Sequence, residues 1–179
     1  SFEITDLNLI KNVAKTKKPI IISTGLSKIN EIKMAFNTAK KYGAKDITLL
    51  YCISSYPAKY DDFNLRNIKI LKKNFKCRVG LSDHTTDNRV AFLASAIGAE
   101  VFEKHIALEN QTKGHDINFS LKGKELRIYR NEIDLSYQLL GQNRFLRNKS
   151  ENKSKIFRRS IFASKFIRKG EKFNLKNIV

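Results

Sequence analysis

The chain has 179 residues, 41% of them apolar, which is enough to bury one hydrophobic core but short for a complete eight-unit β/α barrel. Its formal charge of +18 predicts attraction to anions, and nucleic acid, an anionic membrane or a phosphorylated substrate all fit that sign. The apolar runs are shorter than the roughly 18 residues of a membrane span, no signal peptide opens the chain, and the two cysteines lack C-x-x-C spacing, so we expect a cytoplasmic protein without membrane association or disulfides.

The first part of the chain is predicted to form one β/α unit preceded by a helix. Residues 5–14 have the pattern of a helix whose own strand lies upstream, and together with the start at Ser1 this favours an N-terminal truncation. The β-branched run at 18–23 predicts a buried strand. Ser27 is expected to cap the helix that follows, and Gly43 is expected to end it.

The same alternation of strand and helix then repeats along the chain. Three further strands and three further helices are predicted, in the order 47–52, 65–75, 77–81, 89–97, 101–106 and 125–140. Repeats of about 25 residues in this order favour parallel strands joined by right-handed crossovers. Both an open doubly wound sheet and half of a barrel satisfy that order, since four units cannot close a barrel alone.

The composition changes after residue 141. Residues 142–156 are rich in Lys, Asn and Ser, as is typical of a linker, and residues 159–164 alternate like a strand. We therefore expect a partial β/α barrel over 1–141, a linker over 142–156 and the beginning of a small second module over 157–179.

Polar side chains follow each of the four predicted strands. In parallel β/α folds, ligands bind at the carboxyl ends of the strands, where loops and helix N-termini converge. These ends carry Ser23, then Ser54 and Tyr56, then Ser82, Asp83 and His84, then Glu103, Lys104 and His105. Helix capping explains any single Ser or Asp, but the coincidence at four ends predicts a site.

His84 and His105, two of the three histidines, fall at the ends of consecutive strands. Two neutral imidazoles together with water suit a divalent ion such as Mn, Co, Ni or Zn, and the alternative is that each ring only forms hydrogen bonds near a loop. Asp83 and Glu103 are candidates to orient the rings or, alternatively, to pair with a basic residue such as Lys104.

The loop after the fourth strand carries His115 and Asp116 next to Gly114. A mobile loop at this rim can close over a substrate. An Asx-type turn at Asp116 explains the same residues equally well.

Several short motifs occur in an order that is typical of one enzyme family. They are PIIISTG at 19–25, LLYC at 49–52, YP at 56–57, GLSDHT at 80–85, GAEVFEKH at 98–105, FSL at 119–121 and RRS at 158–160. Together they resemble the sialic acid (N-acetylneuraminate) synthase family, and most of all its pseudaminic acid synthases. The resemblance implies the C-terminal half of a TIM-type (β/α)8 barrel, followed by the start of a small antifreeze-protein-like (SAF) domain and truncated at both ends.

The resemblance also implies a reaction. Phosphoenolpyruvate would be joined to the aldehyde of an N-acetylhexosamine, giving a nine-carbon 2-keto sugar acid and phosphate. His84 and His105 would be the metal ligands, with Mn²⁺, Mg²⁺ or Co²⁺ as the expected ion that polarises the aldehyde. Together with Asp116 they are the expected catalytic residues, and neuraminate or legionaminate synthesis is the alternative to pseudaminate synthesis.

The substrate positions follow from the same resemblance. Ser23, Ser54 and Ser82 match positions that hold the phosphate and carboxylate of phosphoenolpyruvate, for which hydroxyls and helix N-termini are suited. Tyr56 and Asp116 match positions that contact the sugar.

The family pattern carries two further expectations. One is a domain-swapped homodimer, in which the small domain covers the active site of the partner. The other is that the isolated fragment is inactive, because the Lys and Glu residues that the family uses upstream are absent. The sequence departs from the family pattern at three positions, Tyr51, Ile106 and His115. These departures concern the part of the site that would bind the sugar.

Two other classes of protein fit part of the sequence. A nucleic-acid-binding module would use the eleven Lys and Arg that residues 142–172 hold against two acidic residues, but these are dispersed and no helix-turn-helix, RRM-like or zinc-finger spacing appears. We therefore expect no nucleic-acid partner. Another phosphoenolpyruvate or aldolase-type barrel would keep the polar strand ends but would not predict two histidines there.

Overall fold

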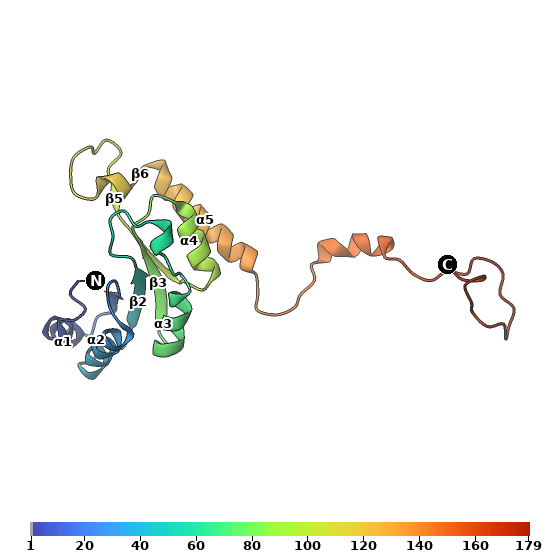
Figure 1. Ribbon diagram of the computed structural model, residues 1–179, viewed down its shortest axis with the longest axis horizontal. Helices are drawn as coiled ribbons and strands as arrows, with labels where there is room; N and C mark the ends of the chain where they lie inside the picture. The colour runs from blue at the N-terminus through green and yellow to red at the C-terminus, as the bar shows by residue number, and fades with distance from the viewer. Residues whose placement is uncertain (1) are drawn as a thin grey trace. The chain divides into compact units, whose positions relative to one another are not determined.

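A computed structural model describes residues 2–179, and the chain forms two compact units, Ser1–Gly141 and Gln142–Val179. The first unit contains a sheet of four parallel strands in the order β1-β2-β3-β4 (Figure 1). The strands are β1 (Ile20–Ser23), β2 (Ile47–Cys52), β3 (Arg78–Asp83) and β4 (Val101–Lys104). The helices are α1 (Leu7–Lys15), α2 (Ile29–Lys41), α3 (Asn67–Phe75), α4 (Asn88–Ala96) and α5 (Lys124–Leu140).

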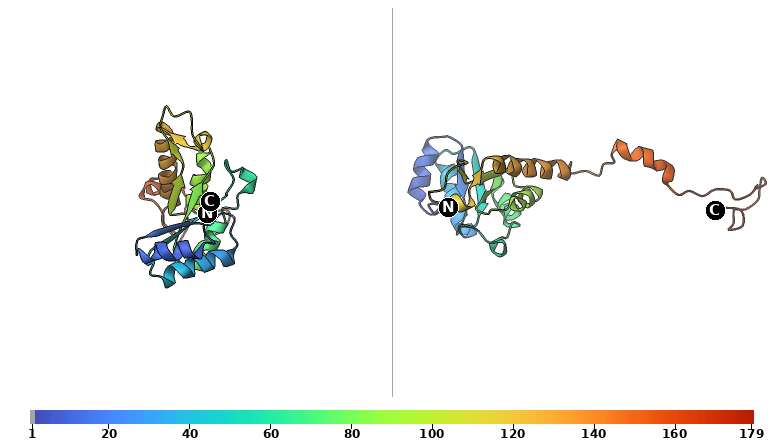
Figure 2. Two further views of the ribbon diagram at one scale, coloured as in Figure 1. Left: turned by 90° about the vertical axis from the view of Figure 1, so that its left-hand side faces the viewer. Right: turned by 90° about the horizontal axis from the view of Figure 1, so that it is seen from above.

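The strand order distinguishes between the two predicted architectures. A doubly wound sheet reverses its strand order at a switch point, whereas the strands here follow one another in sequence order, as in a β/α barrel. The helices neighbour one another in the same way, with α1 beside α2 and α4 beside α5 (Figure 2). The predicted α/β fold with a half-barrel of parallel strands is confirmed.

Alternation along the strands separates a helix-facing side from an inner side. Ile20, Ile22, Leu49, Val79 and Leu81 all belong to the main hydrophobic core, which also contains the buried faces of α2 and α3. Each such side chain contributes about 1.5–3 kcal/mol when it is fully buried. Because successive side chains point to opposite faces, the residues between them line the inner side, which is the side that a barrel closes around.

Side-chain hydrogen bonds mark the starts of α1 and α2. Asp6 accepts a hydrogen bond from Leu9 N at 2.9 Å and so caps α1. The predicted cap of α2 is wrong: the Ser27 hydroxyl donates to Gly25 O at 3.3 Å, and instead the Glu31 carboxylate accepts from Lys28 N at 2.7 Å. A carboxylate in the first turn satisfies a free N–H group and interacts favourably with the helix dipole.

The fourth strand is shorter than predicted and ends before His105. The chain there leaves the sheet, and β5 (Ile106–Ala107) pairs in parallel with β6 (Leu121–Lys122). Leu121 N donates to His105 O at 2.9 Å, which closes this second pairing directly at the histidine. The loop from 108 to 120 is therefore anchored at both ends beside the end of β4.

The second unit contains little regular structure. The segment predicted as a linker contains a 3-10 helix, η3 (Lys149–Phe157). The strand predicted at 159–164 is wrong, because that segment forms only an isolated antiparallel bridge between Ala163 and Ile178. Two hydrogen bonds of 2.8 Å between Phe162 and Val179 accompany it. Among residues 2–179, no helix is long and apolar enough to cross a membrane.

Candidate functional site

The register of β3 and β4 places the two histidines side by side. Ser82 pairs with Glu103 across the strands, and His84 and His105 each follow two residues later on the same face. Their ring centroids are 5.5 Å apart, with the ring planes inclined at 62°. Residues that are 21 positions apart in the sequence thus share one end of the sheet.

The His84 ring is held in one tautomer by its surroundings. The ring is buried, and its Nδ1 lies 2.8 Å from the backbone oxygen of Ile53. Because a carbonyl oxygen can only accept, Nδ1 carries the proton and Nε2 is unprotonated. The Nε2 lone pair accepts from the Ser82 hydroxyl at 3.3 Å. A ring that donates one N–H to a carbonyl and keeps the other nitrogen unprotonated is oriented like a metal-ligating histidine.

The donor set fits a divalent ion held by two protein ligands. His105 Nδ1 lies 3.6 Å from Asp116 Oδ2, so a carboxylate adjoins the second ring. Across residues 2–179, no cluster of three or more His, Cys, Asp or Glu side chains could hold an ion. An ion held by these two imidazole nitrogens would need further oxygen ligands from water or substrate.

Aromatic side chains enclose the two histidine rings. The Tyr56 ring centroid lies 4.3 Å from that of His84, and the Phe119 centroid lies 5.2 Å from that of His105. Tyr56 and Phe119 are themselves 5.7 Å apart, so the four rings form one cluster. The site prediction did not include Phe119. Its sequence signal is the FSL motif at 119–121, which belongs to the family pattern but does not specify where the ring lies.

The loop from 108 to 120 brings Asp116 to the site. Asp116 adopts a left-handed backbone conformation at φ 65°, directly before the 3-10 helix η2 (Ile117–Phe119). The Ser120 hydroxyl donates to Asp116 O at 2.7 Å and holds this turn. The carboxylate does not cap η2, and it faces His105. His115 is exposed and takes no part in the ring cluster.

The remaining predicted residues lie along the same edge of the sheet. Ser82 contacts His84 directly, whereas Ser23 ends β1 and pairs in register with Leu50, two strands away from β3. Ser54 follows β2 by two residues and is half-buried. The Thr24 hydroxyl next to Ser23 donates to Leu50 O at 3.0 Å, so it serves the sheet itself.

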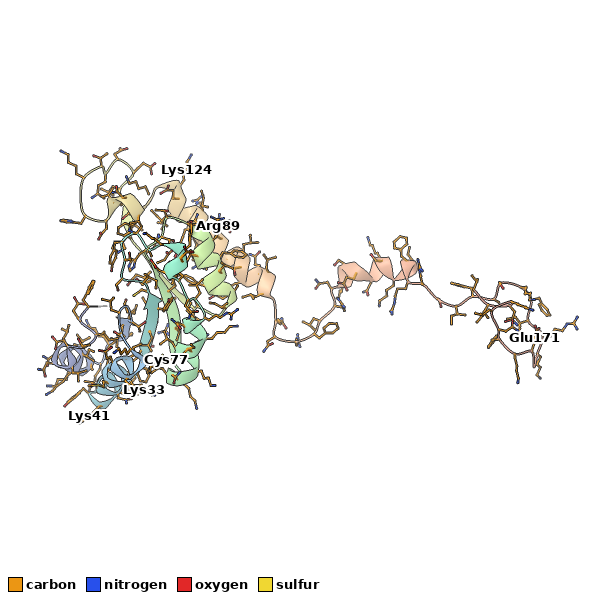
Figure 3. The ribbon with its side chains drawn as sticks, in the orientation of Figure 1. Lys33, Lys41, Cys77, Arg89, Lys124 and Glu171 are labelled. Carbon is orange, nitrogen blue, oxygen red and sulfur yellow. The ribbon has the colours of Figure 1, made fainter. Side chains whose placement is uncertain are left out.

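Two contacts secure the loop that carries Tyr56. The Tyr51 hydroxyl accepts from Asn64 N at 3.1 Å, which gives a role to a residue that departs from the family pattern. Tyr60 donates to Asp87 Oδ2 at 2.6 Å, and hydrogen bonds from Arg89 hold the pKa of Asp87 far below its usual range. Arg89 lies at the site end of the sheet, and Cys77 lies at the opposite end (Figure 3).

The buried His84 ring should make stability depend on pH. Burial lowers its pKa below the ordinary 6.5. In the unfolded chain His84 binds a proton as the pH falls through about 6.5, while the folded chain stays neutral to a lower pH. The unfolded state then binds more protons. The free energy of unfolding should therefore decrease as the pH is lowered below about 6.5, and this effect should be absent at higher pH.

Urea unfolding at pH 7.5, 6.5 and 5.5 measures this effect in the wild-type chain and in His84→Gln. The wild type should lose stability relative to the variant only in the acidic range. If the free energies of unfolding of the wild type and His84→Gln changed equally between the three pH values, the proposed environment of His84 would be wrong.

The amino-acid sequence of the chain is similar to those of several known proteins. A sequence profile of the NeuB family matches residues 1–145. The chain is 41% identical to the N,N'-diacetyllegionaminic acid synthase of Campylobacter jejuni, covering 99% of this chain and 54% of that protein. It is 38% identical to the pseudaminic acid synthase of Helicobacter pylori, covering 99% and 53%.

A solved structure supports the same assignment. The N-acetylneuraminic acid synthetase of Leptospira borgpetersenii superposes with a TM-score of 0.79 at 31% identity, covering 87% of this chain and 54% of that one. The chain spans about half the length of the curated relatives that it matches. With the profile matching residues 1–145 of 179, the chain belongs to the NeuB family.

Proposed function

We propose that this chain provides the histidine-bearing half of a nonulosonic acid synthase, an enzyme that condenses phosphoenolpyruvate with an N-acetylated hexosamine. The observation that carries the proposal is the pair of adjacent rings, one of which is fixed by Ile53 O with its Nε2 unprotonated. An arrangement that serves only hydrogen bonding near a loop would not require the second imidazole at 5.5 Å.

In this proposal His84 and His105 hold the divalent ion, with Mn²⁺, Mg²⁺ or Co²⁺ as the candidates. When bound there, the ion supplies Lewis-acid polarisation of the sugar aldehyde, which favours attack by C3 of phosphoenolpyruvate. The Ile53 carbonyl keeps His84 in the ligating tautomer. Asp116, at 3.6 Å from His105, orients that ring and faces the position assigned to the sugar.

The anionic substrate is assigned to the hydroxyls along the strand ends. Ser23, Ser54 and Ser82 would bind the phosphate and carboxylate oxygens, assisted by backbone N–H groups at the helix N-termini. The charge of +18 favours the approach of phosphoenolpyruvate. Tyr56 and Phe119 would close the apolar side of the site and exclude water around the aldehyde.

The identity of the acceptor sugar is a further part of the proposal. The FSL and RRS motifs favour the precursor of pseudaminic acid, while the 41% identity to a legionaminic acid synthase supports the precursor of that acid. Residues 157–179 are proposed to begin an SAF domain, which in a domain-swapped dimer would cover the partner's site. A cytoplasmic location is also proposed, because phosphoenolpyruvate and the N-acetylhexosamine are metabolites of the cell interior.

Acceptor-dependent phosphate release tests this function. The gene product that carries this chain is incubated with phosphoenolpyruvate, Mn²⁺ and, in turn, the precursor sugars of pseudaminic, legionaminic and neuraminic acid. We expect phosphate release only when the cognate sugar is present, and the sugar with the highest kcat/KM identifies the enzyme. Absence of release with all three sugars would refute the proposed reaction.

A further inference from the structure

A buried ion pair lies directly behind the two histidines. The strand register that pairs Ser82 with Glu103 also pairs Asp83 with Lys104, on the opposite, helix-facing side of the sheet. Lys104 Nζ lies 3.5 Å from Asp83 Oδ2, and the exposed fractions of the two side chains are only 5% and 0%. Each member of the pair immediately precedes a histidine in the sequence.

The pair is connected to the backbone around His84. Asp83 Oδ1 accepts from the backbone N and the hydroxyl of Thr85, at 2.9 and 2.7 Å. Lys104 Nζ donates to Thr85 O. The residues on both sides of His84 are therefore tied to Lys104, the last residue of β4, which directly precedes His105.

The surroundings of the pair are apolar. Lys104 Nζ lies 5.9 Å from the centroid of the Tyr129 ring, which α5 contributes. Tyr129 packs with Ala91, Leu121 and Ile133 in a second hydrophobic cluster. Among residues 2–179, Asp83 Oδ2 and Tyr129 Oη are the buried side-chain atoms without a hydrogen bond. Thr85 thus satisfies Asp83 Oδ1 and one donor of Lys104, whereas Asp83 Oδ2 faces the Lys104 ammonium at 3.5 Å without a hydrogen bond.

Stability alone does not account for such a pair. Removing two charges from water costs about as much as their attraction returns, and apolar replacements of similar size are often neutral or stabilising. An apolar pair could not form a directional contact between β3 and β4. The Asp83–Lys104 position, one residue before each histidine, is the one that determines how the two imidazoles are placed relative to each other.

We propose that Asp83 and Lys104 are positioning residues for the metal site: their ion pair holds β3 and β4 in the register that places the His84 and His105 rings at ligating separation. This inference rests on the proposed function, since it assigns the histidines to a divalent ion. Neither residue touches the ion or a substrate, because both side chains lie on the other side of the sheet.

Calorimetric titration with Mn²⁺ tests the proposal on the full chain. The variant Asp83→Asn/Lys104→Met removes both charges, leaves the net charge unchanged and keeps an amide oxygen that can accept from Thr85. We expect Mn²⁺ affinity to fall by about 10- to 100-fold, the range found for residues that orient metal ligands, with an unchanged circular dichroism spectrum and urea midpoint. Wild-type affinity in this variant would overturn the proposal.

A matched control comes from the other end of β3. Arg78 pairs with Asp46 at 2.6 Å, and both side chains are about half exposed. Asp46→Asn/Arg78→Met removes a half-exposed ion pair at the start of the same strand, with the same net charge change, and should leave Mn²⁺ affinity unchanged. An equal loss in both double variants would show a general effect of charge removal and would likewise overturn the proposal.

Two further variants keep the outcome decisive. His84→Ala separates the two hypotheses: if it still binds Mn²⁺ like the wild type, the proposed function fails, whereas its loss of binding beside an unaffected Asp83→Asn/Lys104→Met variant defeats only the positioning role. If the double variant does not fold, Lys104→Arg retains the charge but lengthens the side chain. It should weaken Mn²⁺ binding by about tenfold, and unchanged affinity would contradict the inference.

Discussion

Replacement of either His84 or His105 by alanine is expected to weaken Mn²⁺ binding by at least about 100-fold, because each removes one of the two proposed imidazole ligands. The effect should be similar at both positions, since the rings lie 5.5 Å apart and are assigned to one ion. Isothermal titration calorimetry of the folded chain measures it, with circular dichroism to establish that each variant retains its helices.

The third histidine provides the control for this experiment. His115 lies one residue before Asp116 in the same loop but is exposed and outside the ring cluster. His115→Ala should therefore bind Mn²⁺ like the wild type. Binding that survives in both His84→Ala and His105→Ala would remove the metal from this site and leave the two rings as hydrogen-bonding residues.

Gly80→Ala should destabilise the first unit by about 3 kcal/mol, which is the upper end of the usual cost of overpacking a core. A Cβ atom on Gly80 would lie 1.9 Å from the backbone oxygen of Val101 in β4 and 2.8 Å from Leu50 Cδ2 in β2. A backbone oxygen cannot rotate away as a flexible side chain can, so β3 and β4 would have to separate. The free energy of unfolding in urea gives the cost.

Gly141→Ala, in the same unit, is the comparison for this substitution. Nothing lies within 4 Å of a Cβ atom at Gly141, so that change should cost only the roughly 1–2 kcal/mol of a positive φ. Equal costs at the two glycines would mean that the β3–β4 contact tolerates a side chain. Because Gly80 lies two residues before Ser82, a variant that still folds should also bind Mn²⁺ more weakly.

The differences between prediction and structure have a common origin in long-range contacts. The predicted fourth strand is interrupted because Leu121, sixteen residues after His105, donates a hydrogen bond to His105 O and pairs with Ile106 in a second, two-stranded sheet. The segment at 159–164 has the alternation of a strand, but within the described residues its only ladder contact is one bridge to Ile178. Ser27 has the side chain of a helix cap, but the N-cap residue of α2 is Lys28, so the Ser27 hydroxyl donates to Gly25 O and Glu31 accepts from Lys28 N.

The sequence by itself determined the alternation of strands and helices, and the polar residues that end each strand. Both are local properties, because the spacing of apolar residues reports which side of an element is buried. The parallel order of the strands follows from them, and with it the expectation that His84 and His105 share one edge. The family motifs identify the same residues.

Only the tertiary structure decided which atoms meet at that edge. The Ile53 carbonyl that selects the tautomer of His84, the Phe119 ring beside His105 and the Lys104–Asp83 pair behind the histidines all join segments that lie far apart in the sequence. Periodicity specifies the face on which a side chain lies, but not the register between two strands or the path by which a loop returns. Those depend on backbone hydrogen bonds and packing across the sheet, which no local pattern of residues encodes.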